Sequence, residues 1–122
     1  MKFALEPLEQ GYTIKAYAPE WIQINTEKHY QSLLLMPDQI IGKWPITNSD
    51  QISVDDIQVL ADYQPQIILL GTGASQQILA PKLFASLMAQ GIGYEVMATG
   101  AACRTYNVLL SEGRKVLAAL IL

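Results

Sequence analysis

The sequence predicts an α/β fold. We expect a single domain, residues 1–122, built in three layers. Its C-terminal half has the order β-α-β-α-β and forms a mixed β-sheet, which packs with an antiparallel β-layer from the N-terminal half. A chain of 122 residues has the length of one domain and can bury a substantial core. Hydrophobic residues make up 51% of it and charged residues 16%, which excludes a disordered chain. The first half alternates apolar with polar residues, whereas the second switches between short apolar runs and helical spacing.

The first half is expected to form two antiparallel hairpins. Pro19 and Pro37 each begin a turn between two strand-like segments whose residues alternate or are apolar. Trp44, which precedes Pro45, is expected to close this half over the core. The four expected strands are residues 12–18, 21–25, 32–36 and 39–44.

The second half is expected to alternate helices and strands. Ser53 can cap a helix whose first turn contains Asp55 and Asp56, because acidic side chains complement the positive end of a helix. From residue 66 the order is β-α-β-α-β, which predicts right-handed crossovers onto one sheet. The expected elements are a strand at 66–70, a helix from Pro81 to Gly91, a strand at 93–98, a helix from about Gly100 to Glu112, and a strand at 114–122.

Charge and residue usage exclude several functions. The net charge is −3 and the eight basic residues form no stripe, so we expect no nucleic-acid binding. His29 is the only histidine and Cys103 the only cysteine, which excludes a metal site rich in either residue; we expect no metal and no cofactor. A Cys103–His29 catalytic pair would require two distant segments to meet. A single cysteine is typical of a reducing compartment.

The chain carries no recognisable targeting or membrane signal. Residues 1–10 contain one lysine and a short apolar run interrupted by Glu6 and Pro7, which is not the pattern of a signal or transit peptide. No apolar run approaches the ~20 residues that span a bilayer. We therefore expect a soluble, cytoplasmic protein that does not span a membrane.

A glycine-containing stretch, LLGTGASQQ (69–77), invites a comparison with nucleotide-binding loops. Gly71 and Gly73 follow a strand, where glycines let the backbone approach a phosphate. The third glycine of the dinucleotide fingerprint would fall at Gln76, and the next expected helix begins too late, at Pro81. We favour a tight turn over a phosphate cradle.

A second stretch, ATGAACRTYN (98–107), begins an expected helix capped by Thr99. Cys103 borders the inward stripe of this helix and is expected to pack in the core, the alternative being a reactive thiol near a helix N-terminus. Arg104 points the other way and, with Thr72 and Thr99, could line a small polar pocket for a carboxylate or phosphate. The alternative is an arginine that is solvated or bonded to carbonyls of the helix or a loop. The candidate pocket comprises Gly71, Thr72, Gly73, Thr99, Cys103, Arg104 and Asn107.

The segment from residue 65 to 120 resembles the family of small proteins that includes the mitochondrial complex I (NADH:ubiquinone oxidoreductase) assembly factor 3. The specific parts are LLGTG (69–73), GIGYEVM (91–97) and ACRTYNVLLSEGR (102–114). The stretch SLLLMPD…W (32–44) fits more loosely, and Ala98 stands where an acidic residue is expected in relatives. The resemblance implies a compact α/β fold with a mixed sheet between helices and a further β-layer. It implies no established enzyme activity, and it suggests a role in assembling a respiratory complex through protein contacts.

Two functions therefore compete. We favour a non-enzymatic protein-binding domain whose partners are proteins such as membrane-complex subunits, and a homo-oligomer is compatible with the sequence. This hypothesis predicts exposed apolar residues, with strand 114–122 as one candidate interface. The alternative is a small-molecule or anion-binding protein or enzyme that uses the candidate pocket. In a third interpretation the motifs are purely structural: the glycines serve turns, and Tyr106 and Asn107 brace the last helix.

Overall fold

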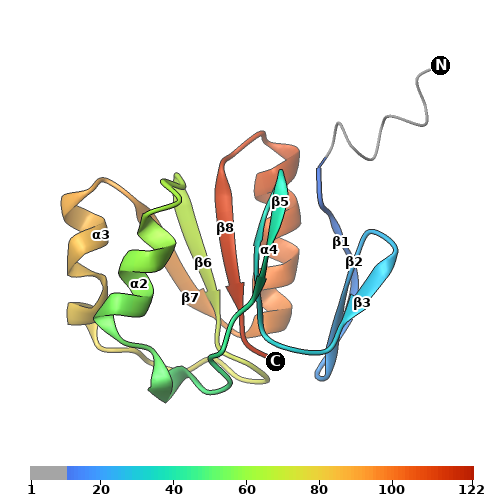
Figure 1. Cartoon of the computed structure of the whole chain (residues 1–122), viewed down its shortest axis with the longest axis horizontal. Coiled ribbons are helices and arrows are strands. Elements are labelled where there is room, and N and C mark those ends of the chain that lie inside the picture. The colour runs from blue at the N-terminus through green and yellow to red at the C-terminus, as the bar shows by residue number, and fades with distance from the viewer. Residues whose placement is uncertain (1–10) are drawn as a thin grey trace.

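The computed structural model describes residues 11–122 (Figure 1). The N-terminal residues discussed above for a targeting signal lie outside this range. A five-stranded mixed sheet forms the centre, in the order β5-β4-β8-β6-β7. Its strands are β4 (Leu33–Met36), β5 (Gln39–Lys43), β6 (Ile67–Gly71), β7 (Gly93–Met97) and β8 (Val116–Leu120).

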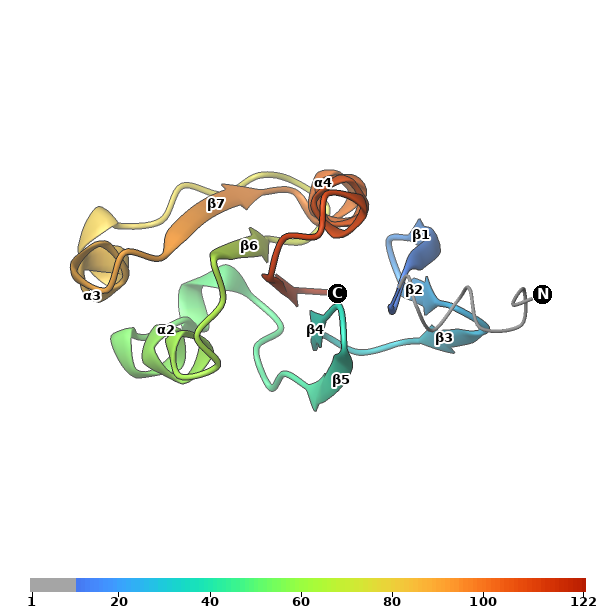
Figure 2. The same ribbon diagram turned by 90° about the horizontal axis from the view of Figure 1, so that it is seen from above.

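A second, three-stranded sheet lies outside the first, in the order β1-β2-β3. Figure 2 shows three layers: helices α2 and α3 cover one face of the central sheet, and helix α4 together with the small sheet covers the other. The predicted fold class and the three layers are confirmed, with the second predicted hairpin, β4–β5, joining the central sheet. The remaining elements are β1 (Ile14–Ala18), β2 (Trp21–Ile24), β3 (Glu27–His29), η2 (Ser49–Gln51), α2 (Val54–Ala61), η3 (Pro81–Phe84), α3 (Ala85–Ala89) and α4 (Thr99–Ser111).

Strand β8 occupies the middle of the central sheet. It pairs with β4 in antiparallel and with β6 in parallel orientation, and all five of its residues are buried. The suggestion that residues 114–122 provide an interface is therefore wrong. An almost wholly apolar run is the pattern of a strand covered on both faces, and this is the role of β8.

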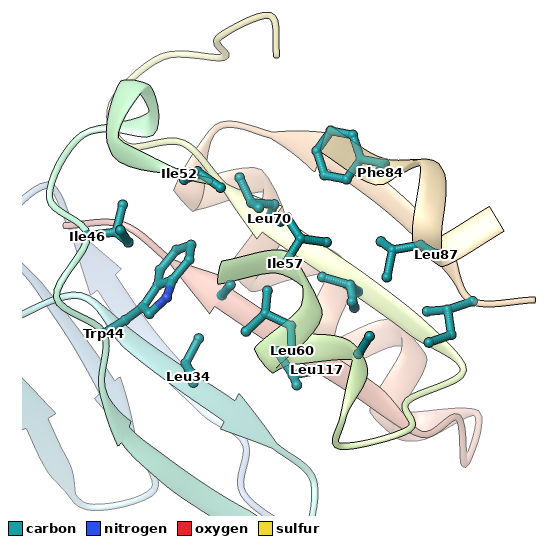
Figure 3. Packing of buried hydrophobic residues seen from close by; sticks show 14 of the residues in the cluster. Leu34, Trp44, Ile46, Ile52, Ile57, Leu60, Leu70, Phe84, Leu87 and Leu117 are labelled. Carbon is teal, nitrogen blue, oxygen red and sulfur yellow. The ribbon is translucent and has the colours of Figure 1, made fainter. Parts of the chain in front are cut away.

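The central sheet separates two hydrophobic clusters. Along β8, Leu117 and Ala119 face the cluster beneath α2 and α3, whereas Val116, Ala118 and Leu120 face the cluster beneath α4 and the small sheet. Figure 3 shows the first cluster, in which Trp44 is buried as predicted. The cluster beneath α4 contains Ile14, Ile22, Ile24, Leu33, Leu35, Leu69, Ala102, Cys103, Tyr106, Val116, Ala118 and Leu120.

Local signals fixed most helix ends. The Ser53 hydroxyl accepts a hydrogen bond from the Asp56 amide at 3.2 Å, and the Asp56 carboxylate accepts one from the Ser53 amide at 2.9 Å, so α2 begins with a capping box. Gly91 and Gly113 follow α3 and α4 with φ of +74° and +75°, as expected of helix stops. The helix expected from Pro81 instead begins as a 3-10 turn, and α3 is short.

Strand β3 was not predicted from the sequence. Its three residues, Glu27–His29, are all polar and offer no apolar alternation. The turn before it depends on Asn25, which adopts φ 52°, a left-handed conformation that Asn tolerates.

Candidate functional site

The carboxyl ends of β6 and β7 meet the start of α4 and the residues after β8. The Thr72 amide donates to the Met97 carbonyl at 2.9 Å, and the Thr99 amide donates to the Gly73 carbonyl at 2.9 Å. The Ile121 amide donates to the carbonyl of Gly71 at 3.0 Å. The two predicted stretches, 69–77 and 98–107, are thus brought together at one end of the central sheet.

Thr99 does not cap α4, contrary to the prediction. It is the first helical residue; Ala98 occupies the cap position and makes no side-chain bond there. The Thr99 hydroxyl accepts a hydrogen bond from the Gly73 amide at 2.8 Å and donates one to the Ile121 carbonyl at 2.7 Å. Because other segments engage this hydroxyl, it ties the loop after β6 to the residues after β8.

Close packing at the end of β6 and a left-handed backbone in the loop after it explain the two glycines here. A Cβ atom added at Gly71 would lie 2.8 Å from the Thr99 hydroxyl oxygen and 2.9 Å from the Thr99 Cα atom. Gly73 has φ +99°, which few other residues adopt. The Thr72 hydroxyl donates to the Ser75 carbonyl at 2.7 Å. With the amides of Thr72 and Gly73 already bonded within the protein, the geometry favours a tight turn over a phosphate cradle.

Cys103 lies in the core beneath α4, with no exposed surface. Burial raises the pKa of the Cys103 thiol to about 12, and the nearby charge of Arg104 only partly opposes this shift. Since the thiolate is the reactive form, the side chain is a protonated packing group near neutral pH.

Tyr106 and Asn107 join α4 to the small sheet. The Tyr106 hydroxyl donates to the Tyr12 carbonyl at 2.6 Å, and burial, with a smaller contribution from the charge of Asp38, raises its pKa well above the ordinary value. The Asn107 side chain accepts a hydrogen bond from the Ile14 amide at 3.0 Å and donates one to the Ile14 carbonyl at 2.8 Å. Both residues therefore hold β1 against the helix.

Arg104 is exposed on the opposite side of α4, as the helical spacing indicated. Its guanidinium donates a hydrogen bond to the Tyr17 hydroxyl, and its central carbon lies 5.9 Å from the centre of the Tyr17 ring. That ring packs against the first turn of α4, where a Cβ atom added at Gly100 would lie 3.0 Å from Tyr17 Cε1. Tyr17 was not singled out from the sequence, because nothing local links the first hairpin to α4.

A pocket of about 250 Å³ opens beside this contact. Among the predicted site residues, Gly73 and Thr99 line it. Arg104 does not line it but donates a hydrogen bond to Tyr17, which does. Gly71, Thr72, Cys103 and Asn107 do not line it. The pocket is formed by Tyr17, Ala18, Pro19, Gly73, Ala74, Thr99, Gly100, Ile121 and Leu122.

These walls are mostly apolar, with residues of the loop after β6 and of the start of α4 among them, and one wall residue, Tyr17, is bonded to Arg104. Such a pocket suits a small, partly apolar molecule whose anionic end approaches Arg104. Within residues 11–122, no three His, Cys, Asp or Glu side chains gather closely enough to hold a metal ion.

The family to which the chain belongs follows from comparison with known proteins. A family model described as "Protein of unknown function (DUF498/DUF598)" matches residues 14–121. The chain belongs to this family. The match covers both sheets and all the helices described above, so the pocket beside Tyr17 lies on the DUF498/DUF598 fold.

Two relatives in sequence and one in structure illustrate the family. This chain is 34% identical, over 91% of its length, to NADH dehydrogenase [ubiquinone] 1 alpha subcomplex assembly factor 3 of Danio rerio. It spans only 64% of the length of that relative. An uncharacterized protein of Rhodobacter capsulatus is 36% identical, with 96% of this chain and 93% of the relative covered. A crystal structure of a Bordetella parapertussis protein is 35% identical with a TM-score of 0.85, covering 90% of this chain and 94% of that one.

Among residues 11–122, no helix is both long enough and apolar enough to cross a bilayer.

Proposed function

We propose that this chain is a non-enzymatic protein-binding domain that serves as an assembly or accessory factor for a respiratory membrane complex. The observation that carries the proposal is the 34% identity, over 91% of the chain, to an assembly factor of NADH dehydrogenase. Its partners are then subunits of the membrane complex, which it meets in the cytoplasm. The free, buried Cys103 thiol fits a reducing compartment.

Exposed apolar side chains support a protein-binding role. On the helical layer, Val59 of α2 is 53% exposed and Met88 of α3 is 72% exposed. Ile78, in the loop after β6, is 99% exposed, and Tyr30 in the β3–β4 connection is 66% exposed. Aromatic residues and methionine are enriched in protein interfaces, so these positions are candidate contacts.

An affinity pull-down tests this proposal. Tagged protein is crosslinked mildly in its native cells, purified, and analysed by mass spectrometry beside a tag-only control. Enrichment of subunits of a respiratory or other membrane complex is the expected result. Recovery of no protein above the control would contradict the proposal.

A second candidate function is the binding of a small anionic molecule, and the pocket of about 250 Å³ beside Arg104 favours it. Thermal-shift measurements with phosphate, pyrophosphate and short-chain carboxylates test this candidate. A ligand that binds here should raise the melting temperature of wild type more than that of Arg104→Ala. It should raise the melting temperature of the matched surface variant Arg114→Ala as much as that of wild type. Equal rises in melting temperature in all three proteins would exclude ligand binding at the pocket beside Arg104.

A further inference from the structure

The two sheets each end in a strand whose outer edge faces a groove. Strand β3 is the last strand of the small sheet, and β5 is the last strand of the central sheet on the same side. Figure 2 shows the short connection from β3 to β4 crossing between the two sheets. Two adjoining hollows of about 380 Å³ and 410 Å³ follow this connection and share Tyr30, Gln31 and Lys43. We call them together the β3–β5 groove. Residues 28–33 line one side, Ile40, residues 42–45 and Thr47 line the other, and Leu122 also lines it.

In the β2–β3 and β4–β5 hairpins, the strand register places backbone amide and carbonyl groups on the outer edges of β3 and β5. Ile24 pairs with Glu27 across a two-residue turn, and such a flanking pair exchanges both hydrogen bonds. The amide and carbonyl of the next residue, Lys28, therefore face away from β2. The same argument applies to the pair Met36–Gln39, and it places the backbone groups of Ile40 on the outer edge of β5. Within residues 11–122, neither Lys28 nor Ile40 has a backbone hydrogen bond outside its hairpin.

On each of the other two edges a side chain already occupies part of the backbone. Asn107 bonds both the amide and the carbonyl of Ile14 on β1. The Gln76 side chain donates to the Val96 carbonyl on β7 at 3.1 Å. An unoccupied strand edge is a template for pairing with another extended segment. The β3–β5 groove brings two such edges, those of β3 and β5, beside one hollow surface.

The charge of the groove indicates the chemistry of its occupant. Lys28 and Lys43 are exposed at its rim, and His29 is half-buried in its wall. No aspartate or glutamate side chain lines it, although the whole chain carries a net charge of −3; Leu122, the last residue, lines the larger hollow. The Lys28 ammonium lies 4.1 Å from the centre of the Trp21 ring, which orders this cation at one end. Tyr30, 66% exposed, adds an aromatic surface between the two hollows.

We propose that the β3–β5 groove binds an extended acidic segment of a partner protein. The segment pairs through its backbone with a free strand edge and places carboxylates near Lys43 and Lys28, while an adjacent side chain packs on Tyr30. Edge lysines also discourage pairing with neutral or basic strands, which makes the groove selective for acidic ones. This inference rests on the proposed protein-binding function and names the surface and the partner chemistry.

Peptide binding tests the groove directly. The probe is a fluorescent ten-residue peptide of alternating glutamate and threonine, and binding is followed by anisotropy at low salt. Its controls are the matching lysine–threonine peptide and a glutamate–threonine peptide that is N-methylated at alternate residues, which blocks strand pairing without changing charge. We expect only the unmodified acidic peptide to bind. Equal binding of either control, or no binding of the acidic peptide, would overturn the inference.

Two groove variants and one matched control locate the binding. Lys43→Glu places a like charge opposite the peptide and should weaken binding by at least about tenfold. Tyr30→Ala should also weaken it, whereas Lys82→Glu, the same charge reversal on an exposed residue of η3, should leave the affinity within about twofold of wild type. Equal losses of peptide affinity in Lys43→Glu and Lys82→Glu would show general electrostatic attraction and contradict binding in the groove. Circular dichroism confirms that each variant is folded.

The same variants separate this inference from the proposed function. A partner that wild type and Lys43→Glu recover equally well in the pull-down would overturn the groove inference while leaving the protein-binding function standing. If wild type recovers no partner, the proposed function fails, and the peptide measurements still decide whether the groove binds acidic strands.

Discussion

Asn107 and Ile14 are joined by two hydrogen bonds across 93 positions of sequence. The side-chain carbonyl accepts from the Ile14 amide at 3.0 Å, and the side-chain amino group donates to the Ile14 carbonyl at 2.8 Å. One side chain of α4 thereby occupies both backbone groups of a β1 residue. This pair is a main polar connection between the small sheet and the rest of the fold.

Replacing Asn107 should therefore loosen the small sheet. Asn107→Ala leaves both backbone groups of Ile14 without their partner, at a cost of about 1–3 kcal/mol in the free energy of unfolding. Urea unfolding followed by circular dichroism measures the change, with Val108→Ala, an exposed neighbour on the same helix, as the control. Equal stability of the two variants would show that these hydrogen bonds contribute little.

Gly71→Ala should destabilise the protein through a steric clash. The added Cβ atom would lie 2.9 Å from the Thr99 Cα atom, so α4 or the strand must shift. We expect a loss of about 1–3 kcal/mol, typical of overpacking a rigid site. Gly93→Ala on the neighbouring strand is the control, because its nearest contact would be an ordinary 3.7 Å. Chemical denaturation of both variants should separate them clearly; indistinguishable midpoints would refute the close packing at Gly71.

Thr99→Val tests the hydroxyl that links two chain segments. The substitution keeps the shape but removes the partner of the Gly73 amide and of the Ile121 carbonyl. We expect the free energy of unfolding to fall by about 1–3 kcal/mol, because these groups are left unpaired. Thr105→Val is the matched control, since that hydroxyl bonds only a methionine sulfur at 3.5 Å. A smaller effect at Thr99 than at Thr105 would argue against the bridging role.

The buried Cys103 thiol predicts both low reactivity and a fall in stability at alkaline pH. Its pKa is raised from an ordinary 9.0 to about 12 in the folded protein, so the unfolded chain loses this proton first. The stabilisation is complete below pH 9 and is lost as the pH rises from 9 to 12. The raised pKa of Tyr106 acts in the same direction.

Two measurements check this prediction. An aromatic disulfide reagent at pH 8 should modify Cys103 rapidly in urea and very slowly in the native protein. The urea midpoint of wild type should decline above pH 9 more steeply than that of Cys103→Ala. Rapid modification of the folded protein would show that the thiol is accessible.

The sequence predicted the features that depend on neighbouring residues. The helix cap at Ser53, the helix stop at Gly91 and the apolar run of β8 each follow from a few adjacent positions, and each is found. The packing of Cys103 was predicted from its place at the border of the inward stripe and from the usual burial of free cysteine, and the side chain is buried.

Features that depend on distant segments were missed or misassigned. Thr99 has the residue type of a cap, but its hydroxyl is engaged by Gly73 and Ile121, which no local pattern reveals. Tyr17 forms one wall of the pocket because β1 happens to lie beside α4. The pocket therefore keeps only part of the predicted residue set, and its binding role stays a prediction.

The position of β8 has a consequence for how the protein is made. It is the last of the five central strands to leave the ribosome, yet β4 and β6 both pair with it. Until residues 116–120 emerge, the nascent chain holds two halves of a sheet with no strand between them. Such long-range pairing slows folding, and the edges of β4 and β6 that β8 later covers are open to wrong pairing until residues 116–120 are inserted.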